Sequence, residues 1–242
     1  MSELTPLTLT VTDLLAGYDG TRILEEVSFS LSTGERLGVL GRNGMGKTTT
    51  LATIMGLTEF QGGDIAVNGQ SIRALTTYQR ARLGLGYVPQ TRDVFPSLTV
   101  EENLISGLGK QPESRVSYAY ELFPRLEERK QNFGNQLSGG EQQMLAVARA
   151  LMSNPSILIL DEPLEGLSPL LAQQLMTDIE QLVETTGMGC ILVEQHVDVV
   201  LNFATRVLIL ERGKVVFYGT PAELEQQPKL LEETIGLEKM SA

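Results

Sequence analysis

The fold of this chain follows from one stretch, Gly41-Arg42-Asn43-Gly44-Met45-Gly46-Lys47-Thr48-Thr49. It comes after the apolar run 37–40 and before the segment 50–55, so it predicts a strand, a loop and a helix in that order. Its three glycines allow the backbone to turn tightly and to point successive N–H groups into one concavity. The stretch therefore predicts a phosphate-binding loop. The simpler alternative is a glycine-rich turn between a strand and a helix.

Several residues of this loop are candidates for binding a nucleotide. A helix N-terminus contributes only about 0.3 to 1 kcal/mol at an exposed site, which is too little to hold a triphosphate. Lys47 can reach the β- and γ-phosphates, and the Thr48 hydroxyl can complete the shell of a Mg²⁺ ion. The predicted nucleotide-binding residues of the loop are Gly41, Asn43, Gly44, Gly46, Lys47, Thr48 and Thr49.

The composition favours a single globular unit. The chain has 242 residues, of which 42% are hydrophobic and 20% charged, so it can bury a substantial core with room for a smaller lobe. Its net charge of −11 argues against a surface that neutralises nucleic-acid phosphates. Nucleic acid is therefore not expected as a partner.

The sequence predicts no membrane-spanning or secretory segment. A spanning helix needs about 20 mostly apolar residues, and the longest hydrophobic run here is residues 144–148. No basic residue precedes Arg22, so the charged start of a secretory signal is missing. The single cysteine, Cys190, lies in the apolar run 190–193 and cannot form an internal disulfide, which favours a reducing compartment and a buried packing role.

Residues 7–40 alternate in the manner of strands, with turns at 19–20 and 33–34. We expect them to pair as an antiparallel sheet beside the nucleotide site. Tyr18 stands 29 residues before Lys47, and an aromatic ring on such an edge can stack on adenine. Packing of the tyrosine against its own turn is the alternative.

The segment between residues 91 and 155 is predicted to be helical. Thr99 and Glu102 form a capping-box pattern, and residues 118–128 carry apolar side chains four apart. Just before this segment, Gln90 follows a predicted strand and can bring its amide oxygen near a metal or an attacking water. The pattern predicts a helical lobe inserted into an α/β chain.

Two further stretches can bind phosphate or metal. Ser138, Gly139 and Gly140 open a predicted helix, where a hydroxyl, free N–H groups and a positive dipole point outward; a plain N-cap is the alternative. The apolar strand 157–160 ends in Asp161 and Glu162. We expect Asp161 to hold Mg²⁺ and Glu162 to accept a proton from water attacking the γ-phosphate. The alternative is that the two acids lie in a solvated turn, as acidic pairs at the end of a strand usually do.

The remaining pattern completes an α/β chain. It predicts a helix over 169–186, a strand ending at Val193, strands at 207–210 and 214–218, and a last helical region after residues 220–221. The repeated alternation of strand and helix predicts a mostly parallel sheet covered on both faces.

Together these motifs resemble the ATP-binding subunits of ABC transporters over essentially the whole chain. The resemblance rests on their order, in which Ser138 lies 23 residues before Asp161. Finer stretches are similar to the ATPases of branched-chain amino-acid uptake systems, the LivF type, and of the related urea uptake systems. These stretches are Gly-Arg-Asn-Gly-Met-Gly-Lys at 41–47, Thr-Val-Glu-Glu-Asn-Leu at 99–104, Tyr-Glu-Leu-Phe-Pro-Arg-Leu at 120–126 and Leu-Ala-Val-Ala-Arg-Ala-Leu at 145–151.

The resemblance implies the P-loop NTPase fold of ABC ATPases, with a mostly parallel core sheet, an N-terminal antiparallel subdomain and an inserted helical subdomain. It implies one domain over 1–242, divided into a RecA-like core with the antiparallel subdomain (1–90 and 156–242) and the helical signature subdomain (91–155). It also implies a hydrolytic role for Glu162, Gln195 and Gln90, and Mg²⁺ binding by Thr48, Gln90 and Asp161.

The implied mechanism needs partners. Two such domains, identical or related, close head to tail so that ATP lies between the Lys47 loop of one and the Ser138 helix end of the other. Closure would move two integral membrane permease subunits. An extracytoplasmic substrate-binding protein would deliver substrate to these subunits and so would be only an indirect partner of this chain. The chain would then lie peripherally on the cytoplasmic face of the membrane. Residues 94–98 are the candidate docking surface for a membrane subunit, with packing inside the helical lobe as the alternative.

Two positions depart from the family pattern. Many relatives have a histidine that contacts the γ-phosphate where this chain has Gln195, and the only histidine, His196, follows it. Glutamine can exchange hydrogen bonds but cannot take a proton as imidazole can. The branched-chain type commonly has glutamine there. Ser168 stands where many relatives have an aspartate, which weakens the case for communication across a dimer.

Three other functions fit parts of the sequence. An importer for urea or amides shares the finer stretches. A soluble ABC regulator would work without membrane subunits. Such proteins often carry two fused ATPase units or long coiled-coil insertions, and this sequence has neither feature. A small-molecule phosphotransferase would use the same loop, yet residues 137–141 count against it.

Overall fold

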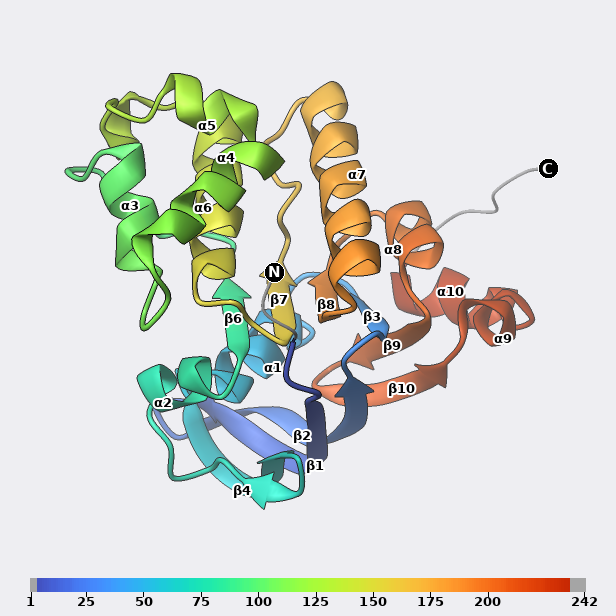
Figure 1. Ribbon diagram of the computed structural model, residues 1–242. Coiled ribbons are helices and arrows are strands. Elements are labelled where there is room, and N and C mark those ends of the chain that lie inside the picture. The colour runs from blue at the N-terminus through green and yellow to red at the C-terminus, as the bar shows by residue number, and fades with distance from the viewer. Residues whose placement is uncertain (1–3, 236–242) are drawn as a thin grey trace.

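The computed structural model describes residues 4–235. Residues 1–3 and 236–242 lie outside the described residues. They include part of the N-terminal stretch considered for a secretory signal and both ends of the predicted domain 1–242. The described chain forms two sheets with helices packed around them (Figure 1).

The central sheet has six strands in the order β10-β9-β3-β8-β7-β6. Neighbouring strands pair in parallel from β9 to β6, and β10 is antiparallel to β9. The strands are β3 (Arg36–Leu40), β6 (Leu85–Val88), β7 (Ile157–Asp161), β8 (Gly189–Val193), β9 (Arg206–Glu211) and β10 (Lys214–Gly219). This arrangement confirms the mostly parallel core predicted from the sequence.

The alternation of side chains along β7 explains why both faces of the central sheet are covered. Leu158 and Leu160 belong to a cluster with helices α6 (Gly139–Met152) and α7 (Pro169–Thr186). Ile157 and Ile159 face the opposite way, into a cluster with the second sheet. All four side chains are fully buried, and such a strand reads as a continuous apolar run in the sequence.

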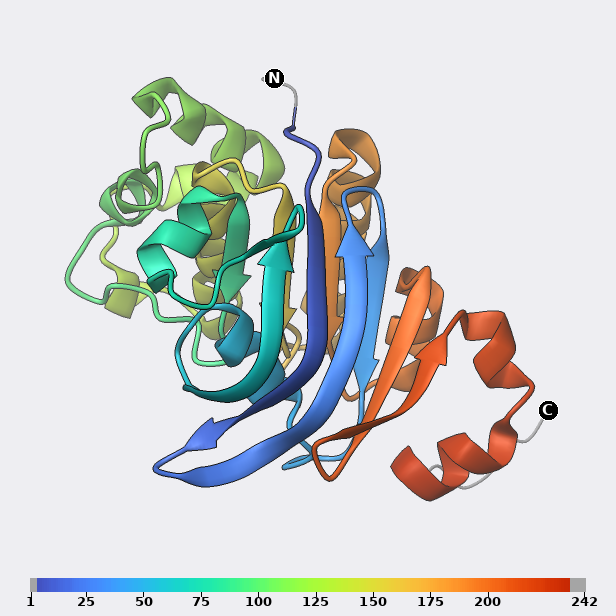
Figure 2. The same ribbon diagram turned by 90° about the horizontal axis from the view of Figure 1, so that it is seen from below.

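The second sheet is antiparallel, in the order β2-β1-β4-β5, and it covers one face of the core in Figure 2. Its strands are β1 (Thr8–Tyr18), β2 (Thr21–Ser32), β4 (Glu59–Val67) and β5 (Gln70–Ser71). The prediction that residues 7–40 all pair here is wrong for β3, which pairs in parallel with β8 and β9. The physical reason is burial: Leu37 to Leu40 are all buried, which only a central strand satisfies.

A group of helices lies in the chain between β6 and β7, at the upper left in Figure 1. It contains α3 (Val100–Ser106), the 3₁₀ helix Glu113–Arg115, α4 (Val116–Leu122), α5 (Pro124–Glu128), the 3₁₀ helix Gly134–Gln136 and α6. The capping box of Thr99 and Glu102 is present at the start of α3, as predicted. The other helices are α1 (Lys47–Ile54), α2 (Thr77–Arg82), α8 (Val197–Phe203), α9 (Pro221–Glu225) and α10 (Pro228–Ile235).

The four-residue apolar spacing over 118–128 does not mark one helix. The chain breaks at Phe123, whose φ of −129° and ψ of 79° are not helical, and α5 begins at Pro124. A residue before proline is driven away from the helical region, which explains the break. By contrast, α7 has the bounds that the sequence predicts, with Ser168 as its N-cap and Gly187 at its end.

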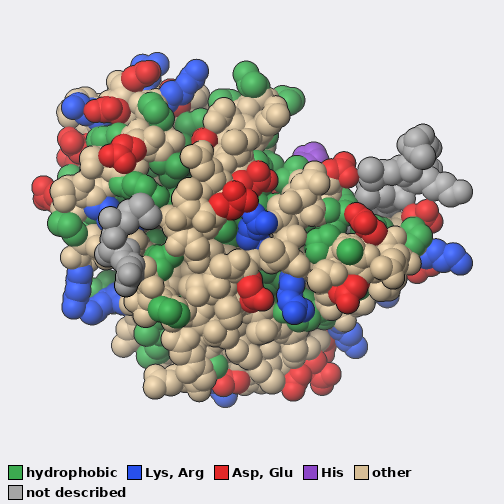
Figure 3. Space-filling model, turned by 45° about the vertical axis from the view of Figure 1, so that its right-hand side comes forward, with side chains coloured by type: hydrophobic (Ala, Val, Ile, Leu, Met, Phe, Trp, Pro, Cys, Tyr) green, Lys and Arg blue, Asp and Glu red, His purple; other side chains and the backbone are tan. Residues whose placement is uncertain are grey.

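The surface is mixed in charge. On the face in Figure 3, acidic and basic side chains are interspersed among uncharged ones. Within residues 4–235, no helix combines the length and the apolar composition needed to cross a bilayer.

Candidate functional site

The loop between β3 and α1 is shaped by three glycines with positive φ. Gly41, Gly44 and Gly46 have φ values of 148°, 79° and 102°. A side chain at Gly41 would lie 2.4 Å from the carbonyl oxygen of Leu210 in β9, so only glycine fits. The loop also accepts a hydrogen bond from the β9–β10 turn, where the Gly213 N–H donates to the Met45 carbonyl over 3.0 Å.

Lys47 is folded into this loop, with only 4% of its surface exposed. Its Nζ donates to the carbonyl oxygens of Gly41 (2.8 Å) and Arg42 (3.3 Å). The same nitrogen lies 3.6 Å from Oε1 of Glu162, which is itself 6% exposed. A buried cation with several oxygen partners is already placed where an anionic ligand at the loop would need it.

Asp161 ends β7 beside Thr48. Its Oδ1 accepts a hydrogen bond from Thr48 Oγ1 over 3.2 Å, whereas its Oδ2 is buried without a hydrogen-bond partner. The pKa of this carboxyl is raised to about 6, mainly by burial and also by the charge of Glu162, while Thr48, Lys47 and Tyr87 act to lower it. An unsatisfied buried carboxylate oxygen next to a hydroxyl is a suitable oxygen-ligand set for Mg²⁺. These residues therefore fit the predicted metal.

Glu162 follows directly, in a backbone conformation that is rare outside glycine, with φ of 48°. Its N–H donates to the Val193 carbonyl over 2.9 Å, which joins the end of β7 to β8. Its Oε2 accepts a hydrogen bond from Gln195 Nε2 over 2.7 Å and a longer one from Gln90 Nε2 over 3.5 Å. The structure thus brings Lys47, Glu162, Gln90 and Gln195 together. A carboxylate held in this way can act as a general base toward water.

Gln195 and His196 take different places. Gln195 contacts Glu162, as described above, while His196 is the N-cap residue of α8 and lines a hollow between α7 and α8. Of the two alternatives left open by the sequence, the described geometry brings only Gln195 to the carboxylate.

Ser138 lies apart from these contacts. It is exposed at the N-cap of α6, where its hydroxyl donates to Glu141 Oε2 over 2.9 Å and accepts from the Glu141 N–H over 3.3 Å. Gly139 is also exposed, and Gly140 is buried. The plain N-cap considered for this serine is therefore present, and its described hydrogen bonds stay within the capping box.

Tyr18 ends β1 and pairs with Thr21 across the hairpin. Its side chain is 42% exposed, so its own turn covers it only partly. An exposed ring at this edge remains available for stacking.

The sequence reasoning missed four residues of the site. Two of them are Glu165, which accepts a hydrogen bond from Gln90, and Arg92, which donates to the Glu165 carbonyl. The other two are Tyr87 and Glu194. Tyr87 faces Asp161 from β6; burial and then the Asp161 charge raise its pKa above its usual range. Glu194 is buried and accepts hydrogen bonds from the N–H groups of Leu164 (2.9 Å) and Gln195 (3.2 Å). Glu194 could have been found, because it is an acid that directly follows the apolar strand β8, as Glu162 follows β7.

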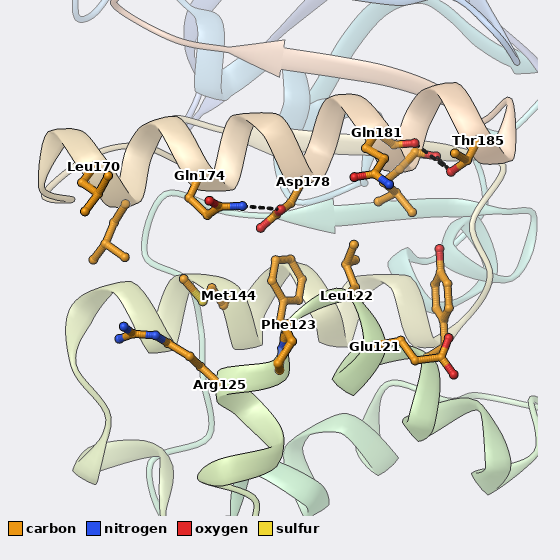
Figure 4. Close-up of a pocket in the computed structure, with 14 residues that line it drawn as sticks. Glu121, Leu122, Phe123, Arg125, Met144, Leu170, Gln174, Asp178, Gln181 and Thr185 are labelled. Carbon is orange, nitrogen blue, oxygen red and sulfur yellow. Dashed lines mark hydrogen bonds between the residues drawn. The ribbon is translucent and has the colours of Figure 1, made fainter.

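A separate hollow of about 720 Å³ lies between α7 and the helices α4 to α6 (Figure 4). Gln174 and Asp178 reach into it from α7, opposite Phe123 and Met144. None of the predicted site residues lines it.

Comparisons with known proteins agree on one family. Residues 24–165 match the family model described as ABC transporter. The chain is 40% identical over 223 residues to the high-affinity branched-chain amino acid transport ATP-binding protein BraG of Pseudomonas aeruginosa, covering 90% of this chain and 95% of that protein. It is 34% identical over 236 residues to the lipopolysaccharide export system ATP-binding protein LptB of Escherichia coli, covering 95% and 97%.

Among solved structures, the chain is similar to CbiO1 of Clostridium perfringens, described as part of the ABC transporter complex cbiONQ. The TM-score is 0.78 at 26% identity, covering 93% of each chain.

Proposed function

The chain belongs to the ABC transporter family of ATP-hydrolysing subunits, and we propose that it powers a membrane importer for branched-chain or other hydrophobic amino acids. The observation that carries the choice of cargo is the 40% identity to BraG over 90% of this chain. The export system protein LptB is a weaker match, at 34% identity.

We assign the roles at the site from the contacts of its residues. Lys47 and the loop N–H groups bind the β- and γ-phosphates, and Gln195 contacts the γ-phosphate. Thr48, Asp161 and Gln90 supply oxygen ligands to Mg²⁺, which when bound offsets the phosphate charge. Glu162 accepts the proton of the attacking water, since its carboxylate is oriented by Lys47, Gln90 and Gln195.

The site is completed by a second ATPase subunit, either another copy or a relative. The support is the exposed position of Ser138 and Gly139 at the start of α6, because a helix N-terminus in solvent can approach phosphate on a neighbouring chain. Movement of the helical subdomain 91–155 against the core, 1–90 and 156–242, would bring the two halves together.

The membrane partners are two permease subunits, with a substrate-binding protein acting on them from the far side. Residues 94–98 are the proposed contact, supported by Phe95, whose side chain is 47% exposed. The chain itself would then be peripheral on the cytoplasmic face of the membrane.

Purification of the tagged full-length chain from detergent-solubilised native membranes tests this proposal. We expect two integral membrane proteins to co-purify, and we expect ATP hydrolysis by the complex in liposomes to rise when a leucine-loaded binding protein is added. Stimulation by urea with its binding protein, or by lipopolysaccharide without one, would replace the proposed cargo. Recovery of the chain without membrane proteins would favour a soluble regulator.

A further inference from the structure

Glu165, three residues beyond Glu162, holds the side chain of Gln90. The Gln90 Nε2 donates to Glu165 Oε2 over 2.7 Å, and the same nitrogen lies 3.5 Å from Glu162 Oε2. The shorter distance is typical of a charge-assisted hydrogen bond, and the longer one is at the limit of a hydrogen bond. Glu165 is therefore the main partner of this amide.

This contact decides which end of the amide points where. Carboxylates at neutral pH only accept hydrogen bonds, so the two acids can be satisfied only by the NH₂ end of Gln90. The carbonyl oxygen, Oε1, must then point away from Glu162 and Glu165. Only that oxygen can act as a ligand to a cation.

The backbone of Glu165 is itself fixed. Its N–H donates to the Glu162 carbonyl over 3.2 Å, and its carbonyl accepts from Arg92 Nη2 over 2.9 Å. The same guanidinium donates from Nε to Gln143 Oε1 in α6 over 2.9 Å. Because Arg92 follows Gln90 by two residues, Glu165 is attached to the 90–92 segment by both its side chain and its main chain.

We propose that Glu165 is a positioning residue that turns the Gln90 amide so that its carbonyl oxygen faces the metal position beside Asp161 and Thr48. This inference rests on the proposed function. A glutamine at 165 could donate to the Gln90 oxygen, so that both orientations of the amide would be accepted. The metal position would then lose a ligand for part of the time.

The first test uses the nucleotide-free, metal-free protein. The side-chain amide resonances of Gln90 are identified in a ¹H–¹⁵N spectrum by their disappearance in Gln90→Ala. We expect Glu165→Gln to shift these resonances toward those of a solvent-exposed glutamine. Glu128→Gln, which changes an exposed carboxylate on α5, serves as the matched control and should leave them in place.

The second test is kinetic. We expect Glu165→Gln to lower kcat roughly three- to tenfold, the effect of weakening one exposed charge-assisted hydrogen bond, and to raise the half-saturating Mg²⁺ concentration. ATP binding in the presence of EDTA and the melting temperature should match the parent protein. In a Gln90→Ala background, Glu165→Gln should have no further effect, because the two residues act as a unit.

Unchanged Gln90 resonances in Glu165→Gln would overturn the inference, as would an equal loss of kcat with and without Gln90. These outcomes differ from failure of the proposed function. If the parent chain did not hydrolyse ATP, the function would fail, and the spectrum would still decide whether Glu165 orients Gln90.

Discussion

The loop around Lys47 and the helix start at Ser138 are the two regions of the chain that we propose bind phosphate, and they differ in how firmly the rest of the fold holds their side chains. Lys47 is buried and is bonded to Gly41, Arg42 and Glu162. Ser138 is exposed and bonded only within its own capping box in the described structure. One region is preorganised by distant parts of the chain, and the other is a local motif that presents itself to solvent.

The difference indicates where changes should act. Residues around Lys47 share contacts, so altering one should affect nucleotide binding and hydrolysis in the isolated chain. Changes at Ser138 should leave the isolated chain's nucleotide binding intact and should affect only the assembled form.

The largest effect is expected from Lys47→Ala. Removing the buried cation should lower kcat/KM for ATP roughly 10³-fold and abolish measurable nucleotide binding, because the loop carbonyls and Glu162 would face the phosphates without compensation. Phosphate release measures kcat/KM, and titration with a fluorescent nucleotide measures binding. Lys130→Ala, in the helical group, should behave as the parent. Parent-like binding in Lys47→Ala would show that the loop is only a turn.

Glu162→Gln should separate binding from chemistry. We expect kcat to fall roughly 10²-fold because the amide cannot accept the proton, while Lys47 still binds ATP. The variant should accumulate as an ATP-bound dimer with its natural ATPase partner, detected by size-exclusion chromatography with MgATP. Hydrolysis at the parent rate would remove Glu162 from the proposed mechanism.

Ser138→Ala is expected to have a smaller, assembly-dependent effect. Loss of the cap should cost about 1 kcal/mol and lower the melting temperature by about 2 to 4 °C. Nucleotide binding by the isolated chain should not change, but hydrolysis by the assembled pair should fall about tenfold. Ser138→Asn keeps a capping side chain that can still donate to Glu141 but removes the hydroxyl, so it should preserve stability and still lower hydrolysis. A loss of monomer binding in either variant would contradict the separation of the two regions.

The smallest effect concerns the pH dependence of stability at Asp161. The folded carboxyl, with its pKa raised by burial to about 6, binds its proton more tightly than the unfolded one, near 3.8. The free energy of unfolding therefore falls as the pH rises between about 4 and about 6, and changes little above about 7. Metal-free Asp161→Asn should escape this loss, so its melting temperature should exceed the parent's by more at pH 7.5 than at pH 5.

The expected difference between the two pH values corresponds to about 1 kcal/mol, or about 2 to 4 °C. A constant offset across this range would mean that Asp161 does not titrate as the burial implies.

Local signals predicted much of the fold. Ser168 and Pro169 start α7 and Gly187 ends it, so both ends could be placed from the sequence. The break at Phe123 also has a local signal, because Pro124 follows it, and here the proline outweighs the four-residue apolar spacing.

What could not be predicted depends on pairing between distant strands. The placement of β3 in the core depends on β8 and β9, more than 150 residues away. Likewise, Tyr87 meets Asp161 and Gln90 meets Glu165 only because β6 lies beside β7. Nothing in the local sequence around these residues specifies that register. Motifs therefore predicted the first members of the candidate site, and strand order determined which further residues lie beside them.

The contact between Gly41 and Leu210 has a consequence for dividing the protein into pieces. The loop that contains Lys47 packs against β9 at the Leu210 carbonyl, and the Met45 carbonyl in this loop accepts a hydrogen bond from Gly213 in the turn after β9. A fragment limited to residues 24–165 would carry the recognisable motifs but would lack both of these contacts as well as Gln195. Such a fragment should not retain nucleotide, so the last third of the chain is as necessary for the pocket as the motif itself.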